Sequence, residues 1–236
     1  MTSFVLKMIA IITMCTDHLG NAIFKNISVM NLIGRISFPI FAFQISEGYS
    51  HTKSLKKYFS RLILFALISQ VPFMLFLSVY SEAFYLNIFF TLALGLVSIF
   101  IYDKIVDTRF ALYKNEKINS IFKKSFGIFI VVLLGIISEV CKFDYGFFGI
   151  AIIFLFHFFR NDKIGIIISF MTACIIKYGI DIIQYGYSIW YILLCIFTIL
   201  PILLISLYNG KQGKKVKYLL YLFYPVHLAI IYFIFH

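Results

Sequence analysis

Residues 188–207 read SIWYILLCIFTILPILLISL and contain no charged side chain. A helix of about 20 mostly apolar residues spans the hydrocarbon core of a bilayer. Eight further windows qualify or nearly qualify: 4–24, 29–50, 60–80, 84–102, 125–142, 145–159, 163–184 and 217–235. Lipid offers no partner to unsatisfied backbone groups, and the windows lack the strict alternation of barrel strands. The sequence therefore predicts an all-α, polytopic membrane helical bundle of about nine transmembrane helices.

The composition excludes other classes of protein. Of the 236 residues, 62% are hydrophobic and only 13% are charged, whereas a soluble domain is near half apolar and a quarter charged. A soluble enzyme, a disordered tail and a nucleic-acid-binding domain do not fit. We expect a single membrane domain over residues 1–236, so any chemistry takes place inside the bundle. The four cysteines are scattered and show no metal-binding or disulfide spacing, so we expect no metal site.

The basic residues predict an orientation for the bundle. The net charge of +11 comes from basic residues that fall on alternate connections between windows, while the opposite connections hold only Lys25 and Lys142. Cytoplasmic connections carry the excess of Lys and Arg, so the N-terminus is predicted to be cytoplasmic. The predicted cytoplasmic residues are Lys53, Lys56, Lys57, Arg61, Lys104, Arg109, Lys114, Lys117, Lys123, Lys124, Arg160, Lys163, Lys211, Lys214, Lys215 and Lys217.

Three ionisable residues lie in the first window, where such groups are costly and therefore suggest function. Lys7 and His18 are 11 residues apart, which places them on one helix face, separated by roughly 16 Å along the axis. Imidazole is suited to general acid–base catalysis near neutral pH, and Lys7 near the cytoplasmic end suits a phosphate-bearing donor. The alternative is that Lys7 snorkels to the headgroups and His18 caps the span. Asp17 points away from His18, about 100° around the helix.

The second window carries polar groups at both ends. Arg35 lies near its outer end, where Asp17 is the expected partner, and Pro39 is expected to kink the helix. Gln44, Glu47 and His51 share a face towards the cytoplasm. Arg35 and Glu47 are 12 residues apart, about 18 Å of rise, so they serve different ends of one cavity.

Three polar features lie further along the chain. Lys177 and Asp181 are spaced i, i+4, as expected for a pair that neutralises itself within one span. His227 fits a packing role as well as a catalytic one. Asp144 directly precedes the sixth window, on its predicted outer side.

Six stretches of the chain form a recognisable series: LKMIAIITMCTDHLG (6–20), LIGRISFPIFAFQISEGYSHT (32–52), KYFSRLILFALISQVPF (57–73), LNIFFTLALG (86–95), DYGFFGIAIIFLF (144–156) and YPVHLAIIYFI (224–234). Together they resemble the TraX family, in the family's order and over almost the whole chain. The family is named for a conjugation-system protein that N-acetylates the amino terminus of pilin. The resemblance implies a bacterial cytoplasmic membrane protein that acts on a peptide, pilin-like or glycan acceptor.

The first window is also similar to the membrane acyltransferase-three superfamily, in which an Arg, ten residues and a His recur on the first span. Lys7 and His18 occupy that pattern, and the Lys loses the bidentate phosphate recognition of Arg. FPIFAFQISEGY (38–49) is similar to the superfamily's second-span motif, with Glu47 inserted, and YPVH (224–227) to its closing motif.

The resemblance implies that acetyl-CoA is the donor, bound from the cytoplasm, and that an acceptor amine is acetylated at the membrane or its outer side. His18 would deprotonate the acceptor or accept the acetyl group itself. The expected site residues are catalytic His18 and Asp17; donor-binding Lys7, Gln44, Glu47, His51 and Arg61; and Arg35 and Asp144 on the acceptor side. Three alternatives stay open: O-acetylation of a surface glycan, a small proton-coupled transporter, and an assembly factor without chemistry.

Overall fold

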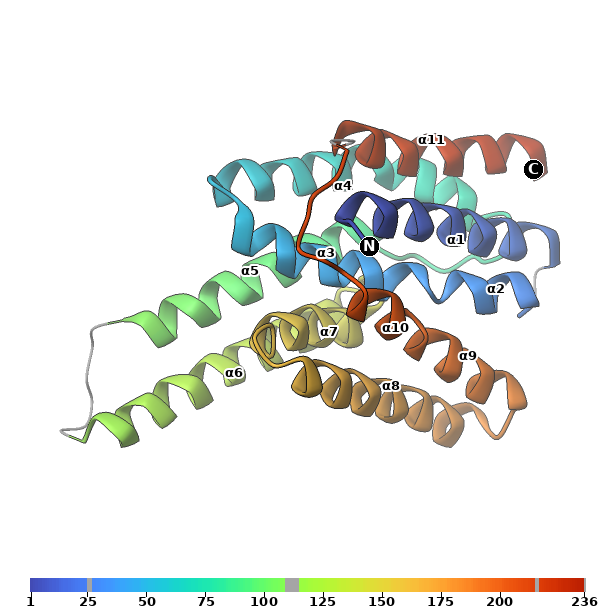
Figure 1. Cartoon of the computed structure of the whole chain (residues 1–236). Coiled ribbons are helices and arrows are strands. Elements are labelled where there is room, and N and C mark those ends of the chain that lie inside the picture. The colour runs from blue at the N-terminus through green and yellow to red at the C-terminus, as the bar shows by residue number, and fades with distance from the viewer. Residues whose placement is uncertain (25–26, 109–114, 215–216, 236) are drawn as a thin grey trace.

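The structure is a computed structural model that describes residues 1–24, 27–108, 115–214 and 217–235 (Figure 1). The described residues form eleven helices and one isolated β-bridge, between Leu86 and Phe143. The helices are α1 (Ser3–Phe24), α2 (Val29–Gly34), α3 (Ser37–His51), α4 (Leu55–Leu77), α5 (Ile88–Asp107), α6 (Glu116–Val140), α7 (Gly146–Phe158), α8 (Lys163–Tyr185), α9 (Ile189–Ile199), α10 (Pro201–Ser206) and α11 (Lys217–Phe235).

The prediction of an all-α membrane bundle is confirmed. Within the described residues, seven helical segments are long and apolar enough to cross a bilayer, with α2–α3 and α9–α10 each counted as one. Two shorter apolar helices, Gly146–Phe158 and Tyr221–Phe235, complete the set. Each of these nine segments overlaps one window predicted from the sequence, although the ends differ, most of all at α6, which begins at Glu116 and not at residue 125.

The break between α2 and α3 has a local cause. A proline ring clashes with the carbonyl four residues earlier, and for Pro39 that carbonyl belongs to Arg35, where the two helices separate. The Ser37 hydroxyl donates to the Gly34 carbonyl at 2.8 Å and so satisfies one group that the break frees. The kink expected at Pro39 therefore lies one turn earlier, and it places Arg35 at the joint.

The helices surround α3 and α7, which lie centrally in the bundle (Figure 1). α3 contacts α1, α5, α7 and α10, while α11 packs along α4 and also touches α1. The middle of α7 is hydrophobic on all sides, and Ile150, Ile152 and Ile153 are fully buried. α1 is thus enclosed by α2, α3 and α11, which places its polar residues inside the protein.

A cluster of polar side chains joins the ends of α3, α5 and α7. His157 is buried, and its Nε2 lies 3.0 Å from Asp103 Oδ1, while its ring meets Tyr49 edge-on. Arg160 donates to the Ser50 hydroxyl at 3.0 Å. These contacts fix the end of the bundle at which α3, α5 and α7 finish.

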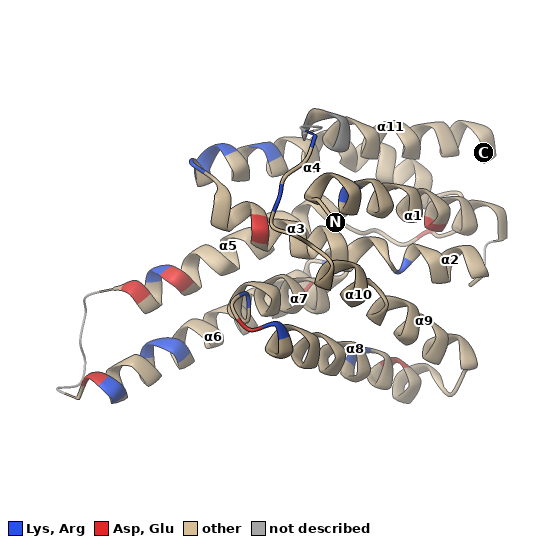
Figure 2. Ribbon diagram, viewed as in Figure 1, with Lys and Arg blue, Asp and Glu red and all other residues tan. Residues whose placement is uncertain are grey.

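Basic residues gather at that same end (Figure 2). It contains the start of α4, the end of α5, the start of α6 and the linker between α10 and α11. Of the residues on which the orientation was predicted, Lys25, Arg109, Lys114 and Lys215 lie outside the described residues, as does the side chain of Lys217. The cytoplasmic location of this end stays a prediction.

The native thiols can test that orientation. Cys141 is exposed at the end of α6, opposite the basic end. If the N-terminus is cytoplasmic, a membrane-impermeant maleimide added to intact cells should label Cys141, and Cys141→Ser should abolish the labelling. In that background Lys211→Cys should be labelled only after permeabilisation. Labelling of Lys211→Cys from outside would invert the topology.

Candidate functional site

A cavity of about 1050 Å³ runs through the helical bundle and collects side chains from distant parts of the chain. α1, α3, α4, α5, α8 and α11 contribute to its wall, as do the connections around residues 80–85, 144–145 and 208–214. Every site residue expected from the sequence lines it: Lys7, Asp17, His18, Arg35, Gln44, Glu47, His51, Arg61 and Asp144. The fold brings these residues to one space, while the role of each stays a prediction.

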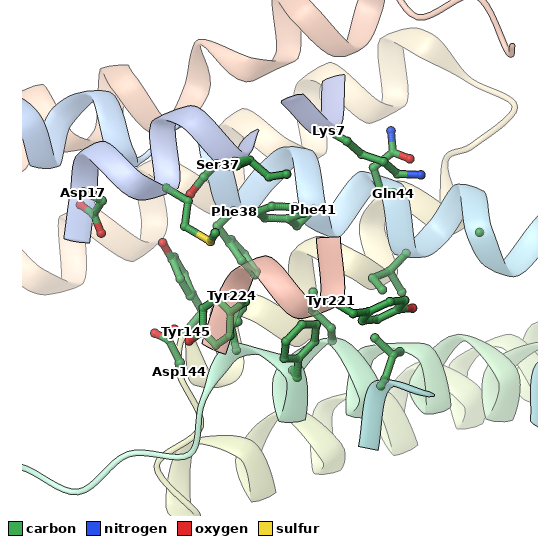
Figure 3. A pocket seen from close by; sticks show the side chains of 18 of the residues that line it. Lys7, Asp17, Ser37, Phe38, Phe41, Gln44, Asp144, Tyr145, Tyr221 and Tyr224 are labelled. Atoms are coloured by element: carbon green, nitrogen blue, oxygen red, sulfur yellow. The ribbon is translucent and has the colours of Figure 1, made fainter. Parts of the chain in front are cut away.

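The cavity has two chemically different ends, with an apolar stretch between them (Figure 3). The basic end carries Lys7, Lys53, Arg61 and Lys214, together with Glu47 and His51. The histidine end carries Asp17, His18, Arg35 and Asp144. Aromatic side chains separate the two, and Phe38, Phe41, Tyr221 and Tyr224 are seen between Lys7 and Asp17. A long ligand with a charged head and an apolar tail would match this order.

At the histidine end, Asp17 is held by two residues of the next helix. Arg35 Nη2 lies 3.8 Å from Asp17 Oδ1, which confirms the pairing expected from the sequence. Asn31 Nδ2 donates to the same oxygen at 3.2 Å, and Asn31 is almost fully buried. Sequence reasoning missed Asn31, although its i, i+4 spacing from Arg35 places both side chains on one face of the helix.

Gly34 allows Asn31 and Arg35 to reach Asp17. A Cβ at this position would lie 2.2 Å from the Cβ of Asp17, closer than side-chain carbons can approach. Any larger residue would push α1 and α2 apart. Since Gly34 lies between Asn31 and Arg35, the close approach sets the distance at which both reach Asp17.

His18 makes a contact that the sequence did not predict. Its Nδ1 lies 2.7 Å from Nε2 of His227 on α11, and the two rings stack with their centroids 5.0 Å apart. His18 is half-buried where it lines the cavity, whereas His227 is 6% exposed and lies behind it. The two histidines are separated by 209 positions in the sequence, so no local pattern could reveal their pairing.

Asp144 occupies the connection before α7 and faces the same end of the cavity (Figure 3). Its backbone carbonyl accepts a hydrogen bond from the Thr91 hydroxyl, and its backbone N–H donates to the Leu86 carbonyl at 2.8 Å. Burial raises the pKa of the Asp144 carboxyl to about 7, although the charge of Arg35 acts to lower it. This carboxyl can therefore exchange a proton near neutral pH.

The basic end contains a donor group without a partner. Ser3 donates to Gln44 Oε1 at 2.7 Å and thereby orients the amide. Gln44 Nε2 is buried and finds no hydrogen-bond partner among the described residues. Lys7 lies one turn after Ser3 on α1 and lines the same cavity, so this part of the wall carries both a cation and an unused amide donor.

The linker between α10 and α11 closes the wall near Lys7. Ser3 and Phe4 donate their backbone N–H groups to the carbonyls of Lys211 and Gln212, at 2.9 and 3.1 Å. The N-terminal N–H groups of a helix have no partner within the helix, so the linker satisfies part of this need in α1. It also brings Lys214 to the cavity.

Lys177 and Asp181 form the self-neutralising pair expected from their spacing. Lys177 Nζ lies 2.6 Å from Asp181 Oδ2, and both residues line the cavity. At the basic end, the expected face of Gln44, Glu47 and His51 turns towards the cavity, since all three residues line it. Glu47 Oε2 lies 3.9 Å from His51 Nδ1.

Comparison with known proteins gives a family match and distant relatives. A family model described as TraX protein matches residues 3–235. The chain is 33% identical over 113 residues to a "Probable fimbrial assembly protein FimC, serogroup H1" of Dichelobacter nodosus, covering 42% of this chain and 46% of that protein. It is 28% identical over 159 residues to "Uncharacterized protein RP591" of Rickettsia prowazekii (strain Madrid E), covering 67% of this chain and 56% of the relative. The chain thus spans about half the length of these relatives, and no solved structure matches.

The Asp17–Arg35 pair should be energetically coupled. Asp17→Asn and Arg35→Gln should each lower the melting midpoint in detergent by about 5 °C, because each leaves a charge unpaired. The double variant should lose clearly less than the sum. The matched control combines Arg35→Gln with Asp103→Asn at the far end of α5, and these losses should add. Additive losses for Asp17 and Arg35 would contradict the pairing.

Proposed function

The chain belongs to the TraX family, and on this premise we propose that it is a membrane acetyltransferase that moves an acetyl group from acetyl-CoA to an amine. The single observation that carries the proposal is the order of groups along the cavity: a basic end, an aromatic middle and an end with a histidine and carboxylates. Acetyl-CoA has the same order, from phosphates through the pantetheine arm to the thioester.

The basic end supplies what the donor needs. Lys7, Lys53, Arg61 and Lys214 would attract the phosphates of coenzyme A. The unpartnered Nε2 of Gln44 would donate to an amide carbonyl of the pantetheine arm. Lys7 and His18 are separated by roughly 16 Å of helix, a span comparable to that arm, so the thioester would lie beside His18.

The histidine end supplies what an amine acceptor needs. Arg35 is neutralised by Asp17 and Lys177 by Asp181, whereas Asp144 has no ion-pair partner within the described residues. An acceptor ammonium would therefore bind at Asp144 and lose a proton there, since the pKa of this carboxyl is about 7. A glycan hydroxyl could donate a hydrogen bond to this carboxylate but carries no charge to balance it, so we favour N-acetylation over O-acetylation.

Once Asp144 has taken the first proton from the ammonium, the proposed reaction needs one further base, His18. The neutral amine attacks the thioester carbonyl, the C–N bond forms, the C–S bond breaks, and His18 takes the proton from nitrogen and returns it to the leaving thiolate. Asp17 would act through Arg35 and Asn31 to hold the first helix in place, and it would not receive the proton. We therefore propose a positioning role for Asp17 in place of the catalytic role expected from the sequence.

The acceptor we propose is the amino terminus of a pilin-like peptide, reached from the outer face of the bacterial cytoplasmic membrane. The TraX family is associated with pilin acetylation, and one relative is described as a probable fimbrial assembly protein. Both support a pilin-processing membrane protein.

Loss of His18 should abolish the reaction without unfolding the protein. His18→Ala should lower acetyl transfer at least about 100-fold, the low end for removal of a general base, as measured by thiol release and by the mass of one acetyl group added to a peptide. The control His157→Gln, a buried histidine away from the cavity, should keep near-normal turnover. Near-normal turnover in His18→Ala would remove His18 from the chemistry.

Lys7 should act on the donor rather than on the chemical step. Lys7→Ala should raise the KM for acetyl-CoA more than it lowers kcat, because it removes attraction to the phosphates. The unaltered protein should show a KM for acetyl-CoA that rises with salt, since ions screen that attraction. A KM unchanged by both treatments would place the phosphates elsewhere.

A further inference from the structure

We propose that His227 is a positioning residue that fixes the tautomer of His18 and leaves Nε2 of His18 free to act as the base. Two hydrogen bonds in series link the pair to the backbone of α11. His227 Nδ1 lies 2.8 Å from the carbonyl oxygen of Phe223, and His227 Nε2 lies 2.7 Å from His18 Nδ1.

The direction of both hydrogen bonds follows from the carbonyl. A carbonyl oxygen only accepts, so the proton of His227 must be on Nδ1. In the neutral ring Nε2 then carries a lone pair and accepts from Nδ1–H of His18. His18 is thereby left with a lone pair on Nε2, and this nitrogen has no hydrogen-bond partner among the described residues.

Aromatic packing keeps the two rings in register. Phe223 stacks on His227 with ring centroids 4.9 Å apart, and Tyr224 meets the same ring at 5.7 Å. Phe76 packs at a tilt against His18, with the two ring centroids 4.9 Å apart. A ring enclosed in this way cannot rotate to exchange its two nitrogens without displacing its neighbours.

The arrangement uses the orienting logic of a catalytic triad, with a backbone carbonyl and a second imidazole in place of a carboxylate. When His18 Nε2 takes a proton from the acceptor amine, the proton on His18 Nδ1 can shift to His227 Nε2, so the pair shares one positive charge. The shift reverses when the proton passes to the thiolate, and no further reactant is needed. This role rests on the proposed function.

Two substitutions separate positioning from packing. His227→Gln keeps the acceptor for His18, since its side-chain carbonyl oxygen can take the place of Nε2. His227→Phe keeps a ring of similar shape and loses the acceptor. We expect His227→Phe to lower kcat about 100-fold with little change in the KM for acetyl-CoA, and His227→Gln to restore most of kcat.

The tautomer can also be read without any turnover. Solid-state NMR of the protein in bilayers with ¹⁵N-labelled histidine should show His18 protonated at Nδ1 and bare at Nε2, with its signals assigned by their loss in His18→Gln. His227→Phe should release His18 to the Nε2–H form, whereas the control His157→Phe should leave the His18 signals unchanged.

Three results would overturn the proposal: Nε2–H on His18 in the unaltered protein, normal kcat in His227→Phe, or a His227→Gln variant as impaired as His227→Phe. If the unaltered protein transfers no acetyl group, the proposed function fails. The nitrogen spectrum then still decides whether His227 sets the tautomer of His18.

Discussion

The structure depends on the cost of placing charge inside a membrane protein. Asp17 and Arg35 are tolerated in apolar spans because each neutralises the other, and Asn31 supplies a further hydrogen bond to the carboxylate. This contact joins α1 to the break between α2 and α3, and Gly34 allows the two backbones to approach. Since His18 follows Asp17 directly, the pair also determines where the imidazole lies.

The same constraint explains how the cavity is divided. Lys177 and Asp181 neutralise each other within one helix, so they add polarity to the wall without adding net charge. The other lysines of the wall, Lys7, Lys53 and Lys214, lie at the basic end, where a long side chain could extend its ammonium towards the membrane surface. The aromatic middle separates the two environments and gives a ligand a low-dielectric path between them (Figure 3).

Local sequence patterns were sufficient for the spans and for contacts between adjacent helices. Hydrophobic length gave the nine segments, and the cost of a lone Arg35 gave its pairing with Asp17. His227 could not be assigned a partner because it meets His18 through the packing of α11 against α1, which no periodicity encodes. The hydrogen bonds from the backbone N–H groups of Ser3 and Phe4 to the linker before α11 could not be predicted for the same reason.

The histidine pair also resolves a physical conflict at its end of the cavity. A protonated imidazole beside Arg35 would be repelled, and burial in an apolar wall penalises any charge that has no partner. Two neutral rings that hydrogen-bond in series avoid both costs while keeping one lone pair exposed to the cavity. Asp144 is then the carboxyl without an ion-pair partner among the described residues of this end, so the ammonium of the proposed acceptor would balance its charge.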